Sequence, residues 1–230
     1  MKFFNLTGLA LAAVLGVAGV QSAQAATIVQ NGSFETGIPG NTPGLNFGSQ
    51  FSDLNSGSGS SWDVWNGING WTKTTGSGIE IQSNRTLSTI DAHSGQHYVE
   101  LDSNSNSGMA QNIILGVGRY VLSFWYSPRD ASATNGIEYA VGSLTGGYVN
   151  YHTPLAAVPG TWTKITQSFI VKTAGSYALK FTATGRNDSY GGLIDDVSVA
   201  PVPLPAAGLG LMAGLGMLGA LRRRRARQTA

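Results

Sequence analysis

The stretch RYVLSFWYS, residues 119–127, decides the fold class of this chain. Its side chains alternate, so that Tyr120, Leu122, Phe124 and Tyr126 share one face while Trp125 lies on the other. A period of two is typical of a β-strand that buries one of its faces. Outward from this stretch, similar alternation recurs in SYALKFTATG, KITQSFIVKT, GIEYAVG, HYVELDS, GIEIQS and LIDDVSV.

Turn residues separate these runs, among them Pro159-Gly160, Gly146-Gly147 and Gly191-Gly192. No segment between residues 26 and 200 has a sustained helical apolar stripe. Many short strands divided by such turns predict an all-β domain over 26–200, a sandwich of two antiparallel sheets in a jelly roll. The Gly-, Ser- and Asn-rich segment 37–70 is predicted to be a long loop region with one or two short strands.

The first 25 residues have the features of a secretory signal peptide. Lys2 precedes the 13-residue apolar run GLALAAVLGVAGV, and Ala23-Gln24-Ala25 gives a small-x-small cleavage pattern. The run is shorter than the ~20 residues that a membrane-spanning helix needs. We therefore expect residues 1–25 to be removed on export and the mature chain to begin at Ala26.

Residues 201–230 form a second segment outside the domain. Ala206–Leu221 are 16 apolar or small residues, which as a helix would be about 24 Å long. Five arginines follow between 222 and 227, and positive charge beside a span remains on the cytoplasmic side. We expect a single transmembrane helix at 206–221 that anchors an exported body in the inner membrane.

Charge and cysteine content exclude several classes of function. The fourteen basic residues include Lys2 and those five arginines, so residues 26–200 keep eight basic and all twelve acidic residues, a net charge of −4. The body is therefore not basic, which argues against nucleic-acid binding. The chain has no cysteine, which excludes thiol nucleophiles, cysteine-ligated metals and disulfides.

The end of the chain resembles a known sorting signal. VPLPAAGLGLMAGLGMLGALRRRRAR is similar to the VPLPA variant of the PEP-CTERM signals of Gram-negative bacteria, with its motif at Val202, Pro203, Leu204, Pro205 and Ala206. The resemblance implies cutting by an exosortase-type membrane enzyme after signal peptidase has acted. The body would then reach the cell surface or the extracellular polysaccharide matrix, and the inner membrane would hold it only transiently. A permanent single-span anchor is the alternative.

The body resembles the galactose-binding-like jelly rolls, which include many carbohydrate-binding modules. The similarity rests on IVQNGSFETG near its start and YGGLIDDVSV at its end. It implies a structural calcium held by Glu35 and Asp195, with Asp196 as the alternative to Asp195. Strand alternation places Asp195 on the face of Leu193, Val197 and Val199, the expected core face. Two exposed acids without calcium are the other interpretation.

Carbohydrate binding requires aromatic faces together with polar groups. Trp125 on the outer face of its strand, Trp62 and Trp65 in the polar loop region, and Tyr190 before the last strand are the candidates. Glu80, Asp91, Glu100 and Asp102 are candidate glycosidase carboxylates, although Glu100 and Asp102 are expected on a solvated strand face. No nucleophile elbow, zinc-protease helix or P-loop is present.

The sequence thus predicts an exported, non-enzymatic surface or matrix protein that binds glycans. A structural surface or biofilm component without a ligand, and a polysaccharide-degrading enzyme, are the alternatives.

Overall fold

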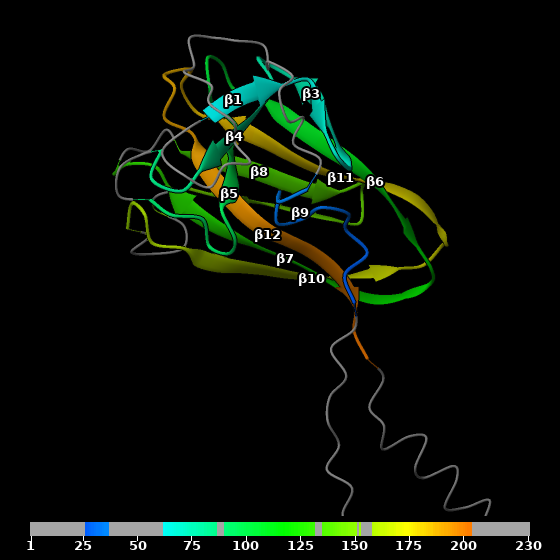
Figure 1. Ribbon diagram of the computed structural model, residues 1–230. Helices are drawn as coiled ribbons and strands as arrows, with labels where there is room; N and C mark the ends of the chain where they lie inside the picture. The colour runs from blue at the N-terminus through cyan, green and yellow to red at the C-terminus, as the bar shows by residue number, and fades with distance from the viewer. Residues whose placement is uncertain are drawn as a thin grey trace, which may run out of the picture. The chain divides into compact units, whose positions relative to one another are not determined.

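The computed structural model describes residues 26–36, 62–86, 90–131, 135–150, 152 and 158–203. Residues Ala25–Val202 form one compact unit, an all-β sandwich of two antiparallel sheets (Figure 1). The fold class predicted from the sequence is therefore confirmed. The expected signal peptide and the expected span at 206–221 lie outside the described residues. Of the residues that are described, none belongs to a helix long and apolar enough to cross a membrane.

Within the described residues each sheet has six strands, and every pairing in both is antiparallel. Sheet A contains, in spatial order, β1 (Trp62–Trp65), β4 (Ile79–Ser83), β5 (His97–Glu100), β12 (Gly192–Pro201), β7 (Gly118–Pro128) and β10 (Thr163–Val171). Sheet B contains β2 (Gly67–Ile68), β3 (Trp71–Thr75), β6 (Gly108–Leu115), β11 (Gly175–Thr184), β8 (Gly136–Val141) and β9 (Thr145–Val149). Trp62 and Trp65, expected in a loop region, thus belong to the edge strand β1.

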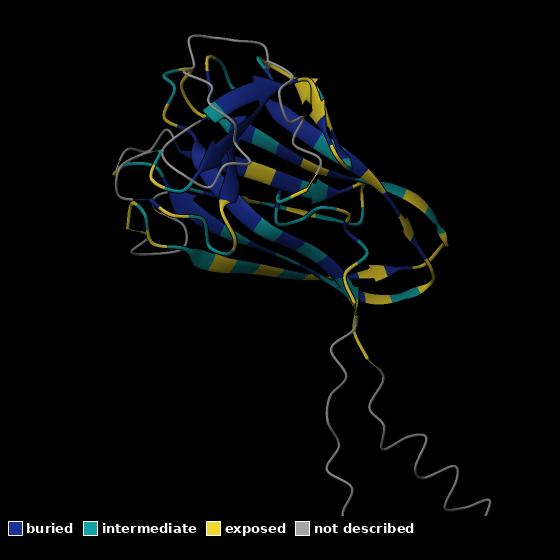
Figure 2. Ribbon diagram, in the orientation of Figure 1, coloured by how far each residue is buried: buried dark blue, intermediate teal, exposed yellow. Residues whose placement is uncertain are grey.

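The core lies between the inner faces of the two sheets (Figure 2). Tyr120, Leu122, Phe124 and Tyr126 of β7 are all buried there, so the alternation of the opening stretch is confirmed. The Phe124 ring meets Phe181 of β11 and Tyr139 of β8 edge-on, at centroid distances of 5.1 and 4.9 Å. Such edge-to-face contacts add to the free energy gained from burying the rings.

A β-bulge in β12 changes which of its residues face the core. Asp195 pairs with Trp125 but Ser198 pairs with Ser123, so β12 has one extra residue there, and Asp196 has a φ of 49°. Leu193 and Asp195 therefore share the outer face with Trp125, whereas Val197 and Val199 lie in the core. The prediction that Asp195 lies on the face of Val197 and Val199 is wrong, because a bulge resets the alternation.

The first described segment, residues 26–36, lies along β12. The amide of Ile28 donates to the Val199 carbonyl, and that of Val197 to the Gly32 carbonyl, both at 2.8 Å. A Cβ at position 32 would clash with the Val197 carbonyl, so glycine permits this close approach. The two ends of the body are consequently side by side, as the ribbon in Figure 1 also shows.

We predict that removal of residues 203–230 leaves the body folded. Every described residue of the main core cluster lies between Val29 and Val199. The melting temperature of residues 26–202, measured by circular dichroism, should stay within about 2 °C of the value for residues 26–230.

Ending the chain at Ser198 is the matched control. It removes buried Val199 together with its backbone bond to Ile28, and should cost about 3 kcal/mol or more of unfolding free energy. An insoluble or molten 26–202 fragment would show that the boundary is misplaced.

Candidate functional site

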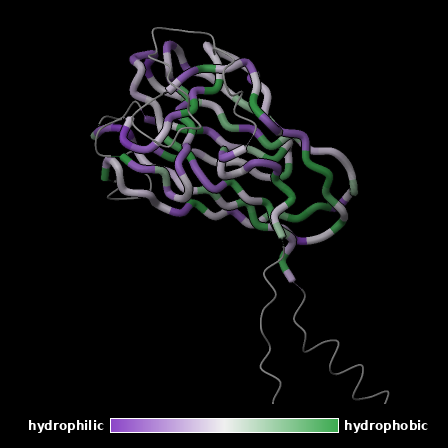
Figure 3. Tube along the Cα trace, viewed as in Figure 1, coloured by the Kyte–Doolittle hydropathy of each residue, from purple (hydrophilic) through white to green (hydrophobic). Residues whose placement is uncertain are grey.

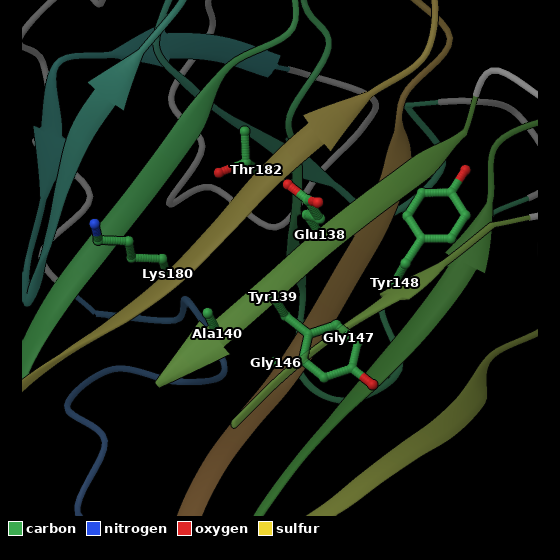
Figure 4. A pocket seen from close by; sticks show the side chains of 8 residues that line it. All are labelled: Glu138, Tyr139, Ala140, Gly146, Gly147, Tyr148, Lys180 and Thr182. Atoms are coloured by element: carbon green, nitrogen blue, oxygen red, sulfur yellow. The ribbon is translucent and has the colours of Figure 1, made fainter. Parts of the chain in front are cut away.

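A groove lies over the outer face of sheet B, where β11, β8 and β9 are neighbours (Figure 4). Its volume is about 510 Å³, within the ~300–1,000 Å³ that is common for small-molecule sites. Its lining residues are Glu138, Tyr139, Ala140, Gly146, Gly147, Tyr148, Lys180 and Thr182.

Strand register orders the outward-facing residues of the groove into two rows that cross the three strands. The first row is Lys180, Ala140 and Gly146, and the second is Thr182, Glu138 and Tyr148. Ala140 and Gly146 carry little or no side chain, so beside Lys180 the first row forms the floor of the groove. The second row places a hydroxyl, a carboxylate and an aromatic ring next to one another.

The polar groups of this groove are accessible. Tyr148 is 44% exposed, and its hydroxyl accepts a hydrogen bond from Asn150 Nδ2 at 2.9 Å. Glu138 and Lys180 are exposed, and neither has a salt-bridge partner within the described part of the chain. The aromatic ring lies at one end of the groove and the ammonium donor at the other, with the carboxylate acceptor between them (Figure 4). This combination suits a sugar chain, which has apolar C–H faces edged by hydroxyls.

Sequence reasoning did not find this groove. None of the four predicted glycan-binding aromatic residues lines it. Glu138, Tyr148 and Lys180 sit on alternating strand positions, which is a signal for exposure only. Their convergence depends on the β11–β8–β9 order, which local patterns do not reveal.

The four predicted aromatic residues do not form one platform. Trp65 is 6% exposed and belongs to the core cluster, while Trp62 is half-buried on edge strand β1. Trp125 lies on β7, four strand positions from β1, which is about 19 Å. Tyr190 is 46% exposed, and the guanidinium of Arg129 lies 5.0 Å from its ring centroid.

The ring of Trp125 has neighbours over it. The imidazole of His93 stacks on it with centroids 3.7 Å apart and planes inclined by 16°, and Lys164 Nζ lies 5.9 Å from its centroid. His93 is held in place by Asp196, with 2.5 Å between Nδ1 and Oδ2. Trp125 is on the outer face of sheet A, as expected, but its ring is covered rather than bare.

The outer face of sheet A also holds a pair of buried carboxyl groups. Glu80 on β4 and Glu100 on β5 are directly opposite one another and are 4% and 0% exposed. Gln82 Nε2 donates to Glu80 Oε1 at 2.6 Å and also to Glu100 Oε2. Arg129 Nη1 donates to both oxygens of Glu100, at 2.9 and 3.0 Å.

The prediction that Glu100 and Asp102 lie on a solvated face is wrong. Both are fully buried because the loop before β12 closes over them. The amide of Gly191 donates to Glu100 Oε1 at 2.8 Å, and that of Asp188 to Asp102 Oδ2 at 3.2 Å. This covering loop is distant in sequence, so strand alternation alone could not show it.

Burial controls the protonation of this pair. Desolvation, together with the charge of Glu80, raises the pKa of Glu100 to about 8 despite Arg129. The pKa of Glu80 is also raised, mainly by burial. Two buried carboxyl groups that face one another beside a single guanidinium are expected to retain one proton between them near neutral pH.

The structure brings Glu35 and Asp195 to the same place, as the calcium prediction requires. Loop residues 94–97 bridge them: Ser94 N donates to Asp195 Oδ2 at 3.1 Å, and the amides of Gln96 and His97 donate to Glu35 Oε1 at 2.8 Å. Burial, with smaller contributions from Asp196 and Glu35, raises the pKa of Asp195 to about 8.

These residues fit calcium only in part. His97 Nδ1 already lies 2.9 Å from Glu35 Oε2, and Asp196 turns toward His93. No set of three or more His, Asp or Glu side chains around a common point occurs in the described ranges. Glu35 and Asp195 would hold the ion, and backbone carbonyls would have to supply the other oxygen ligands.

Comparison with known proteins supports the fold and nothing finer. No protein-family model matches the chain, and no curated protein is similar enough to be a relative. A cyclase from Fischerella sp. TAU, solved with 4-(1H-indol-3-yl)butan-2-one, is similar over 79% of this chain and 100% of its own, with 14% identity and a TM-score of 0.53.

Two carbohydrate-binding modules are more distantly similar in structure. TmCBM61, solved with β-1,4-galactotriose, has 18% identity over 76% of this chain and 99% of its own, with a TM-score of 0.44. The C-terminal CBM6 of a laminarinase from Zobellia galactanivorans has 20% identity over 46% of this chain and 81% of its own, with a TM-score of 0.32.

The carboxyl pair predicts a pH-dependent stability. Because the folded pKa of Glu100 lies above its unfolded value, the folded state keeps a proton that the unfolded state loses from about pH 5 upward. Stability should therefore fall as the pH rises to about 8. Glu80→Gln removes one charge of the pair and should flatten this fall by about 1–2 kcal/mol, or roughly 2–8 °C in melting temperature.

Asp91→Asn is the control, since Asp91 is exposed and outside the pair. Thermal melts of the three proteins between pH 5 and pH 8 measure the effect. Parallel profiles for wild type and Glu80→Gln would mean that the pair does not share a proton.

The calcium prediction is tested by removing the ion. Bound calcium would neutralise Glu35 and Asp195 in the folded state only, so EDTA should lower the melting temperature by about 5–10 °C relative to saturating calcium. Asp195→Asn should abolish the difference, and magnesium should replace calcium poorly. Identical melting curves in calcium and in EDTA would mean that a proton, and not calcium, neutralises Asp195.

Proposed function

We propose that this protein is an exported glycan-binding protein of the cell surface or extracellular matrix, and that it is not an enzyme. The observation that carries the proposal is the groove on sheet B. There Tyr148, Glu138 and Lys180 are exposed beside a low floor of Ala140 and Gly146. The groove is open, which suits a segment of a polysaccharide chain better than a small ligand that must be enclosed.

The groove is a better candidate than the aromatic residues of sheet A. His93 covers one face of Trp125, so a sugar could stack there only after the imidazole had moved. That movement would also disturb the contact between His93 and Asp196. Tyr148 needs no such rearrangement.

The carboxyl pair of sheet A supports a structural role rather than glycosidase chemistry. Glu80 and Glu100 are buried and are engaged by Gln82 and Arg129. A glycosidase instead presents its two carboxyl groups to the sugar on either side of the scissile bond. A pair closed off in this way would hold the covering loop in place.

The proposed location rests on the sequence at the two ends of the chain. Signal peptidase would remove residues 1–25, and the apolar segment 206–221 would hold the body at the outer side of the inner membrane. An exosortase-type enzyme would then act near Val202-Pro203-Leu204-Pro205-Ala206 and release the body to the surface. Calcium at Glu35 and Asp195 is proposed as a structural ion only.

The groove is tested with a glycan array followed by titration calorimetry of the best ligand. Tyr148→Ala and Lys180→Ala should each weaken binding about tenfold, since one stacked ring or one charged hydrogen bond contributes ~1–2 kcal/mol. Their melting temperatures should stay within about 2 °C of wild type, because both side chains are exposed.

Asn112→Ala, an exposed site on the same sheet outside the groove, and Trp125→Ala on sheet A are the controls. Loss of binding in Trp125→Ala but not in Tyr148→Ala would move the site to sheet A. An array without any ligand would favour a structural surface component, and release of reducing ends from a polysaccharide would show an enzyme.

A further inference from the structure

One end of the sandwich differs from the rest of its surface. It consists of the β6–β7 turn at residues 116–117, the β10–β11 turn at 172–174 and the last residues of β12. We call it the tail end, because the chain leaves the body there at Val202. The backbone amide of Val202 donates to the carbonyl of Arg119 at 2.8 Å, which fixes this exit beside the start of β7.

Exposed apolar side chains gather at the tail end. The described residues expose seven large hydrophobic side chains, and four of these are at this end: Ile114 and Val117, both 70% exposed, Ile170 at 48% and Val202 at 41%. Figure 3 shows hydrophobic stretches at this end of the sandwich, and Figure 2 shows exposed residues there. Because the sandwich core is complete without these residues, their exposure is not explained by packing within the body.

The tail end is also the basic end of an acidic body. Arg119 and Lys172 are exposed there, and the stretches 103–129 and 139–187 contain no Asp or Glu at all. Asp195 of β12 lies opposite Trp125, six residues along β7 from Arg119, or about 20 Å. Glu138 of β8 pairs with Thr182 of β11, which in turn pairs with Gly108 of β6. Gly108 is six residues along β6 from Ile114, so Glu138 is also about 20 Å from Ile114 along the strand direction. Both distances exceed the Debye length of about 8 Å at physiological salt.

The length of the connecting chain identifies the partner. Four residue steps separate Val202 from Ala206, where the apolar segment begins, and fully extended they reach at most about 14 Å. If that segment is in a bilayer, the bilayer surface is therefore within about 14 Å of Val202. Such a short tether would keep the bilayer at a high effective concentration beside this end of the body.

We propose that the tail end is a docking surface for an anionic lipid bilayer, the membrane in which the apolar segment 206–221 is proposed to be inserted. Val117 and Ile114 enter the headgroup region, and Arg119 and Lys172 lie against lipid phosphates. Apolar side chains combined with basic ones are the features that bind protein surfaces to anionic membranes. The inference rests on the proposed anchor and not on glycan binding, because the groove and the tail end share no residue.

Docking would orient the body before it is released. A body held only by a flexible connection would tumble, whereas a docked one keeps the exit at Val202 against the membrane. The motif at 202–206 would then remain at the membrane surface, where a membrane-embedded processing enzyme can reach it. Release would follow once the span is cut, since two basic residues and a few apolar side chains bind a bilayer only weakly.

The test uses residues 26–202, which contain the complete core cluster, so that the apolar segment itself cannot bind. Sedimentation with vesicles of phosphatidylcholine and phosphatidylglycerol in a 7:3 ratio is compared with sedimentation on pure phosphatidylcholine. We expect binding to the anionic vesicles that weakens at 0.5 M salt. The double variant Arg119→Glu, Lys172→Glu should lower the partition coefficient roughly 30-fold or more, at about fivefold for each charge removed.

The matched control is Lys164→Glu, Arg186→Glu, which makes the same change of net charge at exposed positions away from the tail end. It should reduce binding by less than about threefold, because its charges lie more than a Debye length from the docked surface. Equal losses in the two double variants, or no difference between anionic and neutral vesicles for the wild type, would overturn the proposal.

A second measurement uses the absence of cysteine from the chain. An environment-sensitive fluorophore on Val117→Cys should shift to the blue on adding anionic vesicles, whereas the same label on Arg186→Cys should not. Association of the fragment with itself would instead shift the Val117 label without lipid and show that this surface pairs two copies. Vesicle binding by the fragment together with a full chain that does not insert would retain the docking surface and refute only the proposed anchor.

Discussion

Burial of one face of β7 between the two sheets is the interaction on which the rest of the structure depends. Tyr120, Leu122, Phe124 and Tyr126 are all removed from solvent, and Phe124 touches rings from two strands of sheet B. Because β7 also pairs with β12 and β10, the same strand fixes the places of both of these strands in sheet A. A substitution in β7 would therefore affect the core and the pairing of β7 with both β12 and β10.

The outer faces of the two sheets have become different kinds of surface. The outer face of sheet A is covered by the loop before β12 and by residues 90–96, so its polar side chains are buried and must be paired or protonated. The outer face of sheet B is open around β8, β9 and β11, and its charged side chains remain solvated. Water access is thus the physical basis for proposing a structural role for the carboxyl pair of sheet A, and for proposing the groove of sheet B as the ligand-binding surface.

Charge is unevenly distributed along the sandwich, which the net charge of the body does not show. The body is acidic overall, yet among the described residues its tail end carries Arg119 and Lys172, while Asp195 of β12 and Glu138 of β8 are about 20 Å away along the strands. In water at physiological salt such separated charges act nearly independently. An acidic protein can therefore present a basic surface to a membrane, while the opposite end keeps the carboxyl groups that organise its loops.

The sequence by itself determined the fold class and the faces of the long strands, because alternation and turn residues act over a few neighbours. The expectation of export also comes from the sequence alone, through the composition of the two chain ends. Tertiary structure decided the rest. The bulge at Asp195–Ser198 reversed the expected face of Asp195, and a distant loop buried Glu100 and Asp102. The groove arose only when β11, β8 and β9 came into register. Each of these outcomes depends on which strands become neighbours, and that choice is made by packing of the whole core, not by any local pattern.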